Sequence, residues 1–352
     1  RSMTMKSAVV LLLGATPAAA FLAAPVSVGL PAPNRGFTGF VIGAAASRSA
    51  GVARSAAAGA EPSASEVQQV LSCAEAAARQ AGGLIRDGVG SEVRKTKANS
   101  RDLLTEVDGA AQRLIEDYVY GHFPGHSFLG EESVDPGQAA SSNALRAVLD
   151  KGVDWLWVVD PIDGTTNFAS GMPLSTVSIG VAYRGDLQVG VVYDPFQDEM
   201  FSAVTGGGCF CNGRRVHAEK DVTELADAVV ISGSPPALNS MMPSLRGINA
   251  LMPMVRTVRM VGSAALHLAW VACGRASAYF EADLNAWDTA AGAVLIREAG
   301  GHMVDLHTGS PYTLETRRIL ATNGNAQVRD HLRAVLVEAR ASTLEDDPAS
   351  ES

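Results

Sequence analysis

The chain has 352 residues, of which 47% are apolar, and a formal net charge of −9 at neutral pH. Residues 1–60 contain five basic side chains and no acidic one, so the remaining chain carries 23 basic against 37 acidic residues. Such an acidic body, without a basic cluster interleaved with aromatics, argues against a nucleic-acid partner, and its length suffices for a large core without disulfides.

Residues 1–60 are predicted to be a disordered targeting segment. Lys6 precedes an apolar run, 8–20, that is too short to span a bilayer and ends in small residues suited to a signal peptidase. The stretch 25–60 is rich in Ala, Gly, Ser and Pro with scattered Arg, which is typical of a transit peptide. This combination resembles the bipartite leaders of algae with secondary plastids, so we expect a plastid (chloroplast) protein without a membrane span in its mature form. The alternative is a secretory signal with a flexible spacer, which would give a secreted or endomembrane protein.

Two amphipathic helices are predicted next. Ser65 is expected to cap the first, because apolar residues follow it at helical spacing. This helix is expected to end near Gly82 and Gly83, or one turn later, before a polar loop, 88–101, that carries Lys97. A second helical pattern over 106–120 places Asp108 in its first turn, near the positive end of the helix dipole.

The most informative segment begins at Trp155, where an apolar run breaks abruptly into polar residues. Pro161 cannot donate a ladder hydrogen bond and Gly164 permits a tight backbone approach, so the strand is predicted to end at about Asp160. The residues that crowd into the following turn offer carboxylates, a carbonyl and hydroxyls: Asp160, Ile162, Asp163, Thr165 and Thr166. This ligand set suits Mg²⁺, which prefers oxygen atoms. The alternative is an ordinary strand-to-turn junction, since these residue types are common in turns.

Two further acidic segments are weak signals when taken alone. Glu131 and Glu132 follow a short apolar run, and could belong to a solvated loop or helix start. Asp288 opens a helical pattern, and could be a plain N-terminal cap.

The rest of the chain alternates helices and strands in blocks, which predicts a mixed α and β fold in one or two lobes. Strands are predicted at 175–183 and 187–193, joined as a hairpin, and then at 199–204, 228–232 and 276–281. Helices are predicted at 264–273, from Asp288 to Gly300, and at 326–340, before an acidic tail, 341–352, that is expected to be disordered.

Cysteine and histidine usage argues against soft-metal and zinc sites. Of the four cysteines, none forms a Cys-x-x-Cys pair, which favours a reduced compartment. Cys209 and Cys211 would share one face of a strand, and a redox switch there is the minor alternative. The seven histidines are scattered without paired spacing, so all are assigned structural or surface roles.

Five motifs, in one order and at compatible spacing, resemble the inositol monophosphatase family of Mg²⁺-dependent, lithium-sensitive phosphatases. They lie at 102–108, 130–133, 160–168, 262–265 and 287–292. The resemblance extends from about residue 65 to about 339 and implies a catalytic domain over 61–340. It also implies an α/β fold of the layered αβαβα type shared by inositol monophosphatases and fructose bisphosphatases.

The resemblance also implies a role for each matching residue. One metal would be surrounded by Glu131, Asp160, the Ile162 carbonyl and Thr165, and a second by Asp160, Asp163 and Asp288. Glu131 would hold a third ion through water, while Asp108 and Thr165 would orient and deprotonate the attacking water; the catalytic set is thus Asp108, Thr165 and Glu131. Substrate contacts would come from Asp163, Gly164, Thr165, Thr166, Gly262, Ser263, Glu281 and Asp288. Many relatives have Thr where this chain has Ser263, but a hydroxyl is retained, and Lys97 matches a lysine on a mobile loop near the phosphate.

The function implied is hydrolysis of myo-inositol monophosphate, and possibly of sugar phosphates, with two or three Mg²⁺ ions and a metal-activated water. Glu281 would accept hydrogen bonds from the inositol hydroxyls. Because Glu281 would also suit a cationic substrate, a histidinol phosphate phosphatase of the same family is the alternative. A non-catalytic, metal-binding regulatory homologue is the alternative from another class. Family membership further implies a homodimer and inhibition by lithium.

Overall fold

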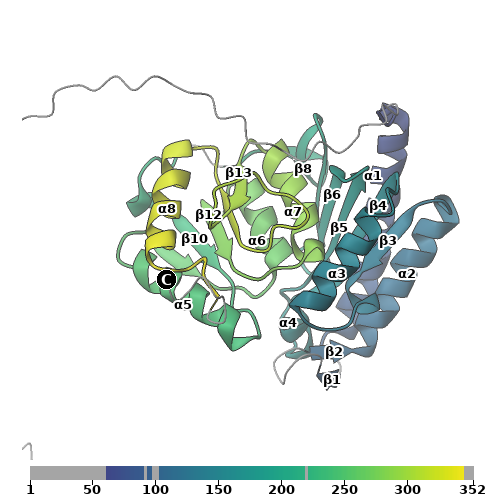
Figure 1. The fold of residues 1–352 in the computed structure, drawn as a ribbon. Helices are drawn as coiled ribbons and strands as arrows, with labels where there is room; N and C mark the ends of the chain where they lie inside the picture. Colours follow the sequence, from purple (N-terminus) through teal and green to yellow (C-terminus); the bar gives the residue numbers. More distant parts are fainter. Residues whose placement is uncertain (1–60, 91–92, 97–102, 219–220, 345–352) are drawn as a thin grey trace, which may run out of the picture. The chain divides into compact units, whose positions relative to one another are not determined.

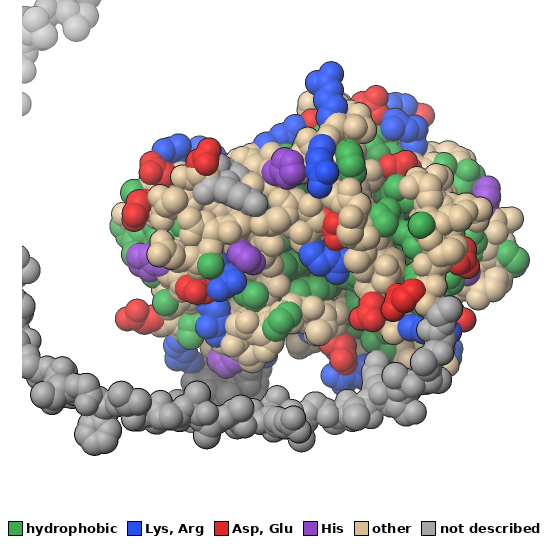
Figure 2. Space-filling view, turned by 90° about the horizontal axis from the view of Figure 1, so that it is seen from above, with side chains coloured by type: hydrophobic (Ala, Val, Ile, Leu, Met, Phe, Trp, Pro, Cys, Tyr) green, Lys and Arg blue, Asp and Glu red, His purple; other side chains and the backbone are tan. Residues whose placement is uncertain are grey.

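In the computed structural model, the described residues are 61–90, 93–96, 103–218 and 221–344, and they form five layers in the order helix, sheet, helix, sheet, helix (Figure 1). This arrangement confirms the predicted αβαβα fold class. Within the described residues, no helix combines the length and apolar character needed to cross a bilayer. On the face in Figure 2, acidic and basic side chains are interspersed among polar and apolar ones.

The first layer consists of helices α1 (Ala64–Gly88) and α2 (Glu106–His122), which pack on one another and on the larger sheet. The cap of α1 is Ser63, whose hydroxyl accepts from the Glu66 amide, while the Glu66 carboxylate accepts from the Ser63 amide at 3.0 Å. The prediction of Ser65 as the cap is therefore wrong. A capping box requires a Glu three residues after the cap, and only Ser63 meets that spacing.

The larger sheet has seven strands. In spatial order they are β3 (Ser127–Gly130), β4 (Trp155–Asp163), β5 (Thr176–Tyr183), β6 (Asp186–Asp194), β7 (Glu199–Val204), β8 (Gly208–Cys211) and β9 (Arg214–Val216). Helices cover both faces, and every residue of β4 is buried, which explains its continuous apolar run. Arg184 and Gly185, with φ values of 51° and 90°, form the predicted hairpin turn between β5 and β6.

The middle layer contains α6 (Ala264–Ala272) and α7 (Ala286–Glu298), which lie between the two sheets. Helix α7 approaches the larger sheet so closely that a Cβ atom on Gly180 would lie 2.5 Å from the Cβ of Ala290. This close contact holds the first turn of α7 over the end of β4, and thereby places Asp288 near the carboxylates of that strand.

The smaller sheet has five strands in the order β11-β10-β12-β14-β13, and an outer layer of two helices covers its other face. The strands are β10 (Val229–Ser232), β11 (Thr257–Arg259), β12 (Ala278–Glu281), β13 (His302–Asp305) and β14 (Ile319–Thr322), and the helices are α5 (Leu238–Leu251) and α8 (Ala326–Glu338). Helix α3 (Gln138–Leu149) and three short helical segments also belong to the described fold: Glu131–Ser133, α4 (Thr165–Ala169) and Leu225–Asp227.

Three further expectations differ from the structure. The predicted loop at 88–101 contains β1 (Val93–Thr96), which pairs with β2 (Leu103–Thr105); Lys97 lies outside the described residues. The strand expected to end near Asp160 runs to Asp163, with a shift of register between the two aspartates. Finally, Ala341, Ser342 and Leu344 are buried, so the expected disordered tail does not begin at 341, because α8 is followed by packed residues.

Candidate active site

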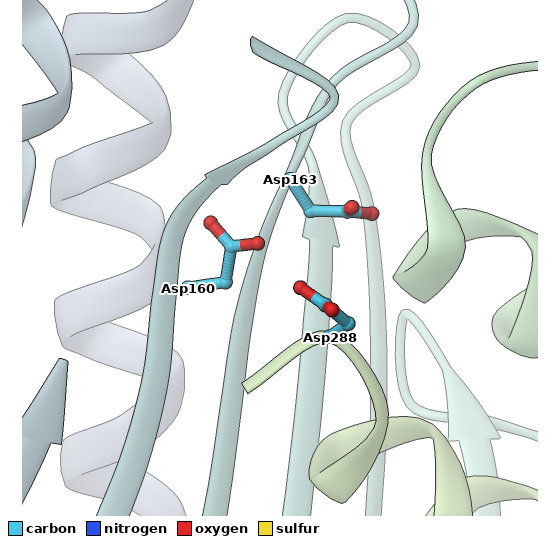
Figure 3. Close-up of side chains that lie close together, drawn as sticks. All are labelled: Asp160, Asp163 and Asp288. Atoms are coloured by element: carbon cyan, nitrogen blue, oxygen red, sulfur yellow. The ribbon is translucent and has the colours of Figure 1, made fainter. Parts of the chain in front are cut away.

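Three aspartates that are distant in sequence converge at one point. Asp160 and Asp163 come from the end of β4, and Asp288 comes from the first turn of α7. The side chains point toward one another (Figure 3), and one carboxylate oxygen from each lies within 4.8 Å of the others. The sequence predicted that these three side chains would converge, and a metal site depends on this convergence more than on any other prediction.

The irregular end of β4 brings its two aspartates to the same side. Residues of a regular strand three positions apart point to opposite faces, but the register shift between Asp160 and Asp163 interrupts this alternation. The Ile162 amide donates to the Asp160 carboxylate at 2.9 Å, which fixes the local bend. Gly164 then adopts a left-handed conformation, with φ at 94°, that turns the chain into α4.

Asp163 joins β4 to α6. Its carboxylate accepts from the backbone amides of Ala264 and Ala265, at 3.1 and 2.7 Å, and from the Ser263 hydroxyl at 2.5 Å. Burial raises the pKa of Asp163 to about 6, although these three donors favour the ionised form. The N-terminus of α6 therefore orients this carboxylate without fully offsetting the cost of burying its charge.

Asp288 is held in a similar way at the start of α7. Its carboxylate accepts from the Asn285 amide at 2.6 Å, and Asn285 is the N-cap of the helix. Burial raises the pKa of Asp288 well above its usual range, and repulsion from Glu131 and Asp163 raises it further. Carboxylates that are buried or half-buried and repel one another are the donor set expected of a site for a hard divalent cation, which would relieve that repulsion.

A hydroxyl and a further carboxylate lie beside this cluster. The Thr165 hydroxyl is 3.3 Å from the Asp108 carboxylate and 3.1 Å from the Ile162 carbonyl oxygen. Asp108 is buried at the third position of α2, where it accepts from the amide and the hydroxyl of Thr105, the helix cap. Helix α2 thus sets the orientation of Asp108 toward Thr165.

The cluster lies at the side of a cavity of about 340 Å³. Glu281, at the end of β12, lines this cavity and accepts from the Tyr279 hydroxyl at 2.5 Å. Burial raises the pKa of Glu281 to about 8. A Cβ atom on Gly233 would lie 1.5 Å from a carboxylate oxygen of Glu281, so a side chain at Gly233 would displace this carboxylate.

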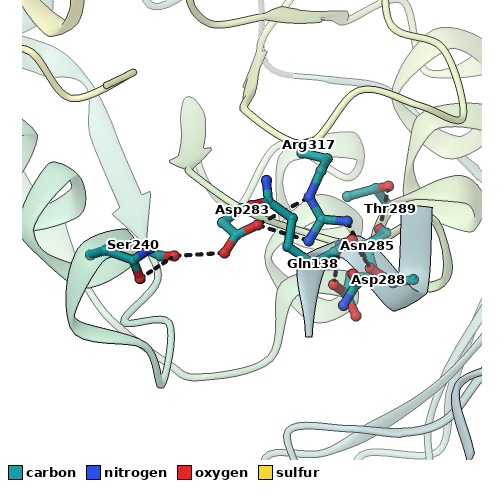
Figure 4. Close-up of polar contacts among 9 residues, drawn as sticks. Gln138, Ser240, Asp283, Asn285, Asp288, Thr289 and Arg317 are labelled. Carbon is teal, nitrogen blue, oxygen red and sulfur yellow. Dashed lines mark hydrogen bonds and ion pairs between the residues drawn. The ribbon is translucent and has the colours of Figure 1, made fainter. Parts of the chain in front are cut away.

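The rim of the cavity carries an ion pair that the sequence did not predict. Arg317 donates to one carboxylate oxygen of Asp283 at 2.8 and 3.0 Å, and to the Ser141 hydroxyl at 3.0 Å (Figure 4). Ser240 donates to the other oxygen of Asp283 at 2.6 Å. These contacts tie α3, α5 and the β12–α7 loop together. The sequence did not indicate that Arg317 pairs with Asp283, because the two residues lie in loops that are far apart in the chain.

Most of the predicted site residues line this one cavity: Glu131, Asp160, Ile162, Asp163, Gly164, Thr165, Thr166, Gly262, Ser263, Glu281 and Asp288. Asp108 lies behind them, in contact with Thr165. His267 also lines the cavity, although the sequence analysis assigned all histidines structural or surface roles. A single histidine within the apolar pattern of α6 carries no sequence signal that distinguishes a cavity wall from the core.

Comparisons with known proteins agree with this geometry. The family model described as "Inositol monophosphatase family" matches residues 66–342. The chain is 37% identical to inositol monophosphatase 1 of Solanum lycopersicum, over 78% of this chain and 95% of that protein. It is 37% identical to the Nus factor SuhB of Pasteurella multocida, over 69% of this chain and 87% of that one. The solved inositol monophosphatase of Anabaena (Nostoc) superposes with a TM-score of 0.65 at 33% identity, over 78% of this chain and 97% of that one. The chain therefore belongs to the inositol monophosphatase family, whose enzymes are phosphoric monoester hydrolases.

Proposed function

We propose that the protein is a Mg²⁺-dependent phosphate monoester hydrolase whose substrate is myo-inositol monophosphate. The observation that carries this proposal is the convergence of Asp160, Asp163 and Asp288 within 4.8 Å beside a cavity of about 340 Å³. Because the cavity also contains Glu281, a group suited to polyol hydroxyls, both parts of the substrate have a complementary surface.

We propose that the oxygen donors at the end of β4 and the start of α7 hold the metal: Glu131, Asp160, the Ile162 carbonyl, Asp163, Thr165 and Asp288. All are hard ligands, which suit Mg²⁺ better than they suit softer metals. When bound, Mg²⁺ supplies positive charge that neutralises the phosphate and lowers the pKa of water.

The roles of the protein groups follow from their positions. The Thr165 hydroxyl can hold an attacking water and pass a proton toward the Asp108 carboxylate, 3.3 Å away. Asp108 is suited to this role because Thr105 fixes its orientation through two hydrogen bonds. Ser263 and Gly262, at the start of α6, would border the phosphate end of the substrate.

Glu281 bears on the choice of substrate. It is buried at the cavity wall and hydrogen-bonded by Tyr279, so it can interact with the ring hydroxyls of inositol. The same carboxyl group would also stabilise an ammonium group, which favours histidinol phosphate as the alternative substrate. The similarity to a protein named Nus factor SuhB supports a second candidate of a different class, a non-catalytic regulatory protein that keeps the metal site.

A phosphate-release panel on the full chain, with and without Mg²⁺, tests these candidates. The panel contains inositol 1-phosphate, histidinol phosphate, fructose 1,6-bisphosphate and adenosine 3′,5′-bisphosphate. We expect Mg²⁺-dependent release, fastest from inositol 1-phosphate. Fastest release from histidinol phosphate would favour the alternative substrate, and no release from any compound would favour the regulatory protein.

Location and assembly are part of the proposal. We propose that residues 1–60 direct the protein to a plastid and that the mature protein forms a homodimer. Fusing these residues to a fluorescent protein in an alga with secondary plastids tests the location, with a fusion lacking them as the control. Light scattering during size-exclusion chromatography tests the assembly, and a monomer mass would contradict it.

A further inference from the structure

The cavity wall contains hydrogen-bonding groups that the proposed metal chemistry does not use. His267 is 1% exposed, and neither of its ring nitrogens has a hydrogen-bond partner among the described residues. The indole nitrogen of Trp287, which lines the same cavity, is likewise buried without a partner in the described part of the chain. Burying polar atoms without partners is unfavourable, so a residue that lines a cavity and carries such atoms is a candidate for contact with a ligand or a water.

His267 lies near residues that orient two of the carboxylates of the site. It lies on α6, four residues after Ser263, the N-cap of this helix. Ser263 donates to Asp163, at the metal end of the cavity. On its other side, the imidazole packs edge-on against the ring of Tyr279, with centroids 4.7 Å apart, and the Tyr279 hydroxyl donates to Glu281. His267 therefore contacts the residue that donates to Glu281, and it lies in the helix whose N-cap donates to Asp163.

The chemistry of the imidazole fixes the class of ligand. Burial lowers the pKa of His267 to about 3, so the ring is neutral at physiological pH. A neutral imidazole offers one donor and one acceptor, and a hydroxyl group can satisfy either of them. The neighbouring indole of Trp287 adds a second donor. An anion would find too few donors here, and a cation would find no charge on the ring.

We propose that His267 is a specificity-determining residue that hydrogen-bonds a hydroxyl group of the polyol part of the substrate. This inference rests on the proposed hydrolase function and adds to it a second hydroxyl contact beside Glu281. The phosphate is held elsewhere, so the contact with His267 discriminates between polyol phosphates and phosphate esters that lack hydroxyls.

Three variants of the full chain test the inference: His267→Leu, which removes both ring nitrogens, His267→Gln, which keeps a donor and an acceptor, and Trp270→Phe as the control. Trp270 lies on the same helix and also has a buried indole nitrogen without a partner among the described residues, but it does not line the cavity. Each variant is assayed with Mg²⁺ on myo-inositol 1-phosphate and on 4-nitrophenyl phosphate, which has no hydroxyl group.

We expect His267→Leu to lower kcat/KM for inositol 1-phosphate by about tenfold, the size of one hydrogen bond, mainly through KM. Activity on 4-nitrophenyl phosphate should stay within about twofold of wild type, and His267→Gln should recover part of the loss. Trp270→Phe should leave kcat/KM unchanged for both substrates. Equal losses on both substrates, or no loss on inositol 1-phosphate, would overturn the inference, because His267 would then serve the fold or bind only a water.

The same data separate this inference from the proposed function. If wild type hydrolyses 4-nitrophenyl phosphate but no polyol phosphate, the hydroxyl contact is refuted while the hydrolase remains. If wild type hydrolyses neither, the proposed function fails, and calorimetry with inositol 1-phosphate and Mg²⁺ then decides the inference by binding alone. Binding that His267→Leu weakens would support the contact, and undetectable or unchanged binding would refute it.

Discussion

At the residue scale, the carboxylate of Asp163 connects parts of the molecule that are a hundred residues apart. It comes from β4, accepts hydrogen bonds from the N-terminus of α6 and lies beside Asp288 of α7. The sequence indicated that Asp163 is an oxygen ligand, because it follows a buried strand. Its hydrogen bonds to α6 could not be predicted in the same way, because residues 264 and 265 contribute only backbone amides, which every residue type except proline provides.

Replacing Asp160 with Asn should abolish turnover while leaving the fold intact. The change keeps the size of the side chain but removes one of the three converging carboxylates, which would weaken binding of the cation. We expect Mg²⁺-dependent phosphate release to fall by about 10³-fold or more. Circular dichroism provides the control for folding. A variant that is well folded and still active with Mg²⁺ would rule out the metal assignment.

Glu281→Gln should affect one substrate more than another. Gln has a similar shape, but its amide nitrogen can only donate hydrogen bonds, whereas both carboxyl oxygens of Glu281 can accept them. We expect the kcat/KM for inositol 1-phosphate to fall by about tenfold, with a smaller effect on an aryl phosphate. Gly233→Ala should resemble this variant, because the added Cβ would meet the Glu281 carboxylate. Equal losses on both substrates would show that Glu281 supports the structure instead of the substrate.

At the scale of elements, helix α1 shows why local signals can mislead. The adjacent Gly82 and Gly83 suggest a place where a helix could end, yet α1 continues through both to Gly88. A Cβ atom on Gly82 would lie 2.4 Å from the ring of Tyr193 on β6, whereas the corresponding position on Gly83 is open. Gly82 is therefore required by the close packing of α1 on the sheet and does not mark a helix end.

This difference yields a matched pair of variants. Gly83→Ala should stabilise the protein by about 0.5–1 kcal/mol, because Ala has the higher helix propensity and nothing opposes its methyl group. Gly82→Ala should destabilise it by about 1–3 kcal/mol, because the methyl group must displace Tyr193. Urea denaturation measures both. If the two variants had the same effect, the contact between α1 and β6 would not be as described.

At the scale of the whole molecule, the sequence predicted individual strands, helices and turns, whereas contacts between distant segments became visible only in the fold. The layered architecture followed from the family resemblance, whereas strand β4 and the candidate oxygen ligands at its end followed from an apolar run and from the turn residues after it. The Asp283–Arg317 pair and the cavity position of His267 could not be predicted, because both depend on how the smaller sheet packs beside α6 and α3. The strand β13 was missed because its four residues are all partly exposed and show no alternation.

The same scale determines how stability depends on pH and metal. Burial raises the pKa of Asp163 to about 6 and that of Glu281 to about 8, and raises the pKa of Asp288 well above its usual range. A carboxyl group with a raised folded pKa binds its proton more tightly in the folded state. Its contribution to stability is complete at pH values below the unfolded pKa and is lost as the pH rises toward the folded pKa.

Without divalent metal, we therefore expect the Tm to fall as the pH rises from about 5 to about 8. Mg²⁺ competes with protons for Asp163 and Asp288, so the increase in Tm that it causes should grow over the same range. Thermal denaturation with EDTA or with excess Mg²⁺, at steps of pH, measures both trends, and Asp160→Asn serves as the control with a weakened site. If the increase in Tm caused by Mg²⁺ did not change with pH, Mg²⁺ would bind away from Asp163 and Asp288, because only groups that exchange protons for metal make that increase depend on pH.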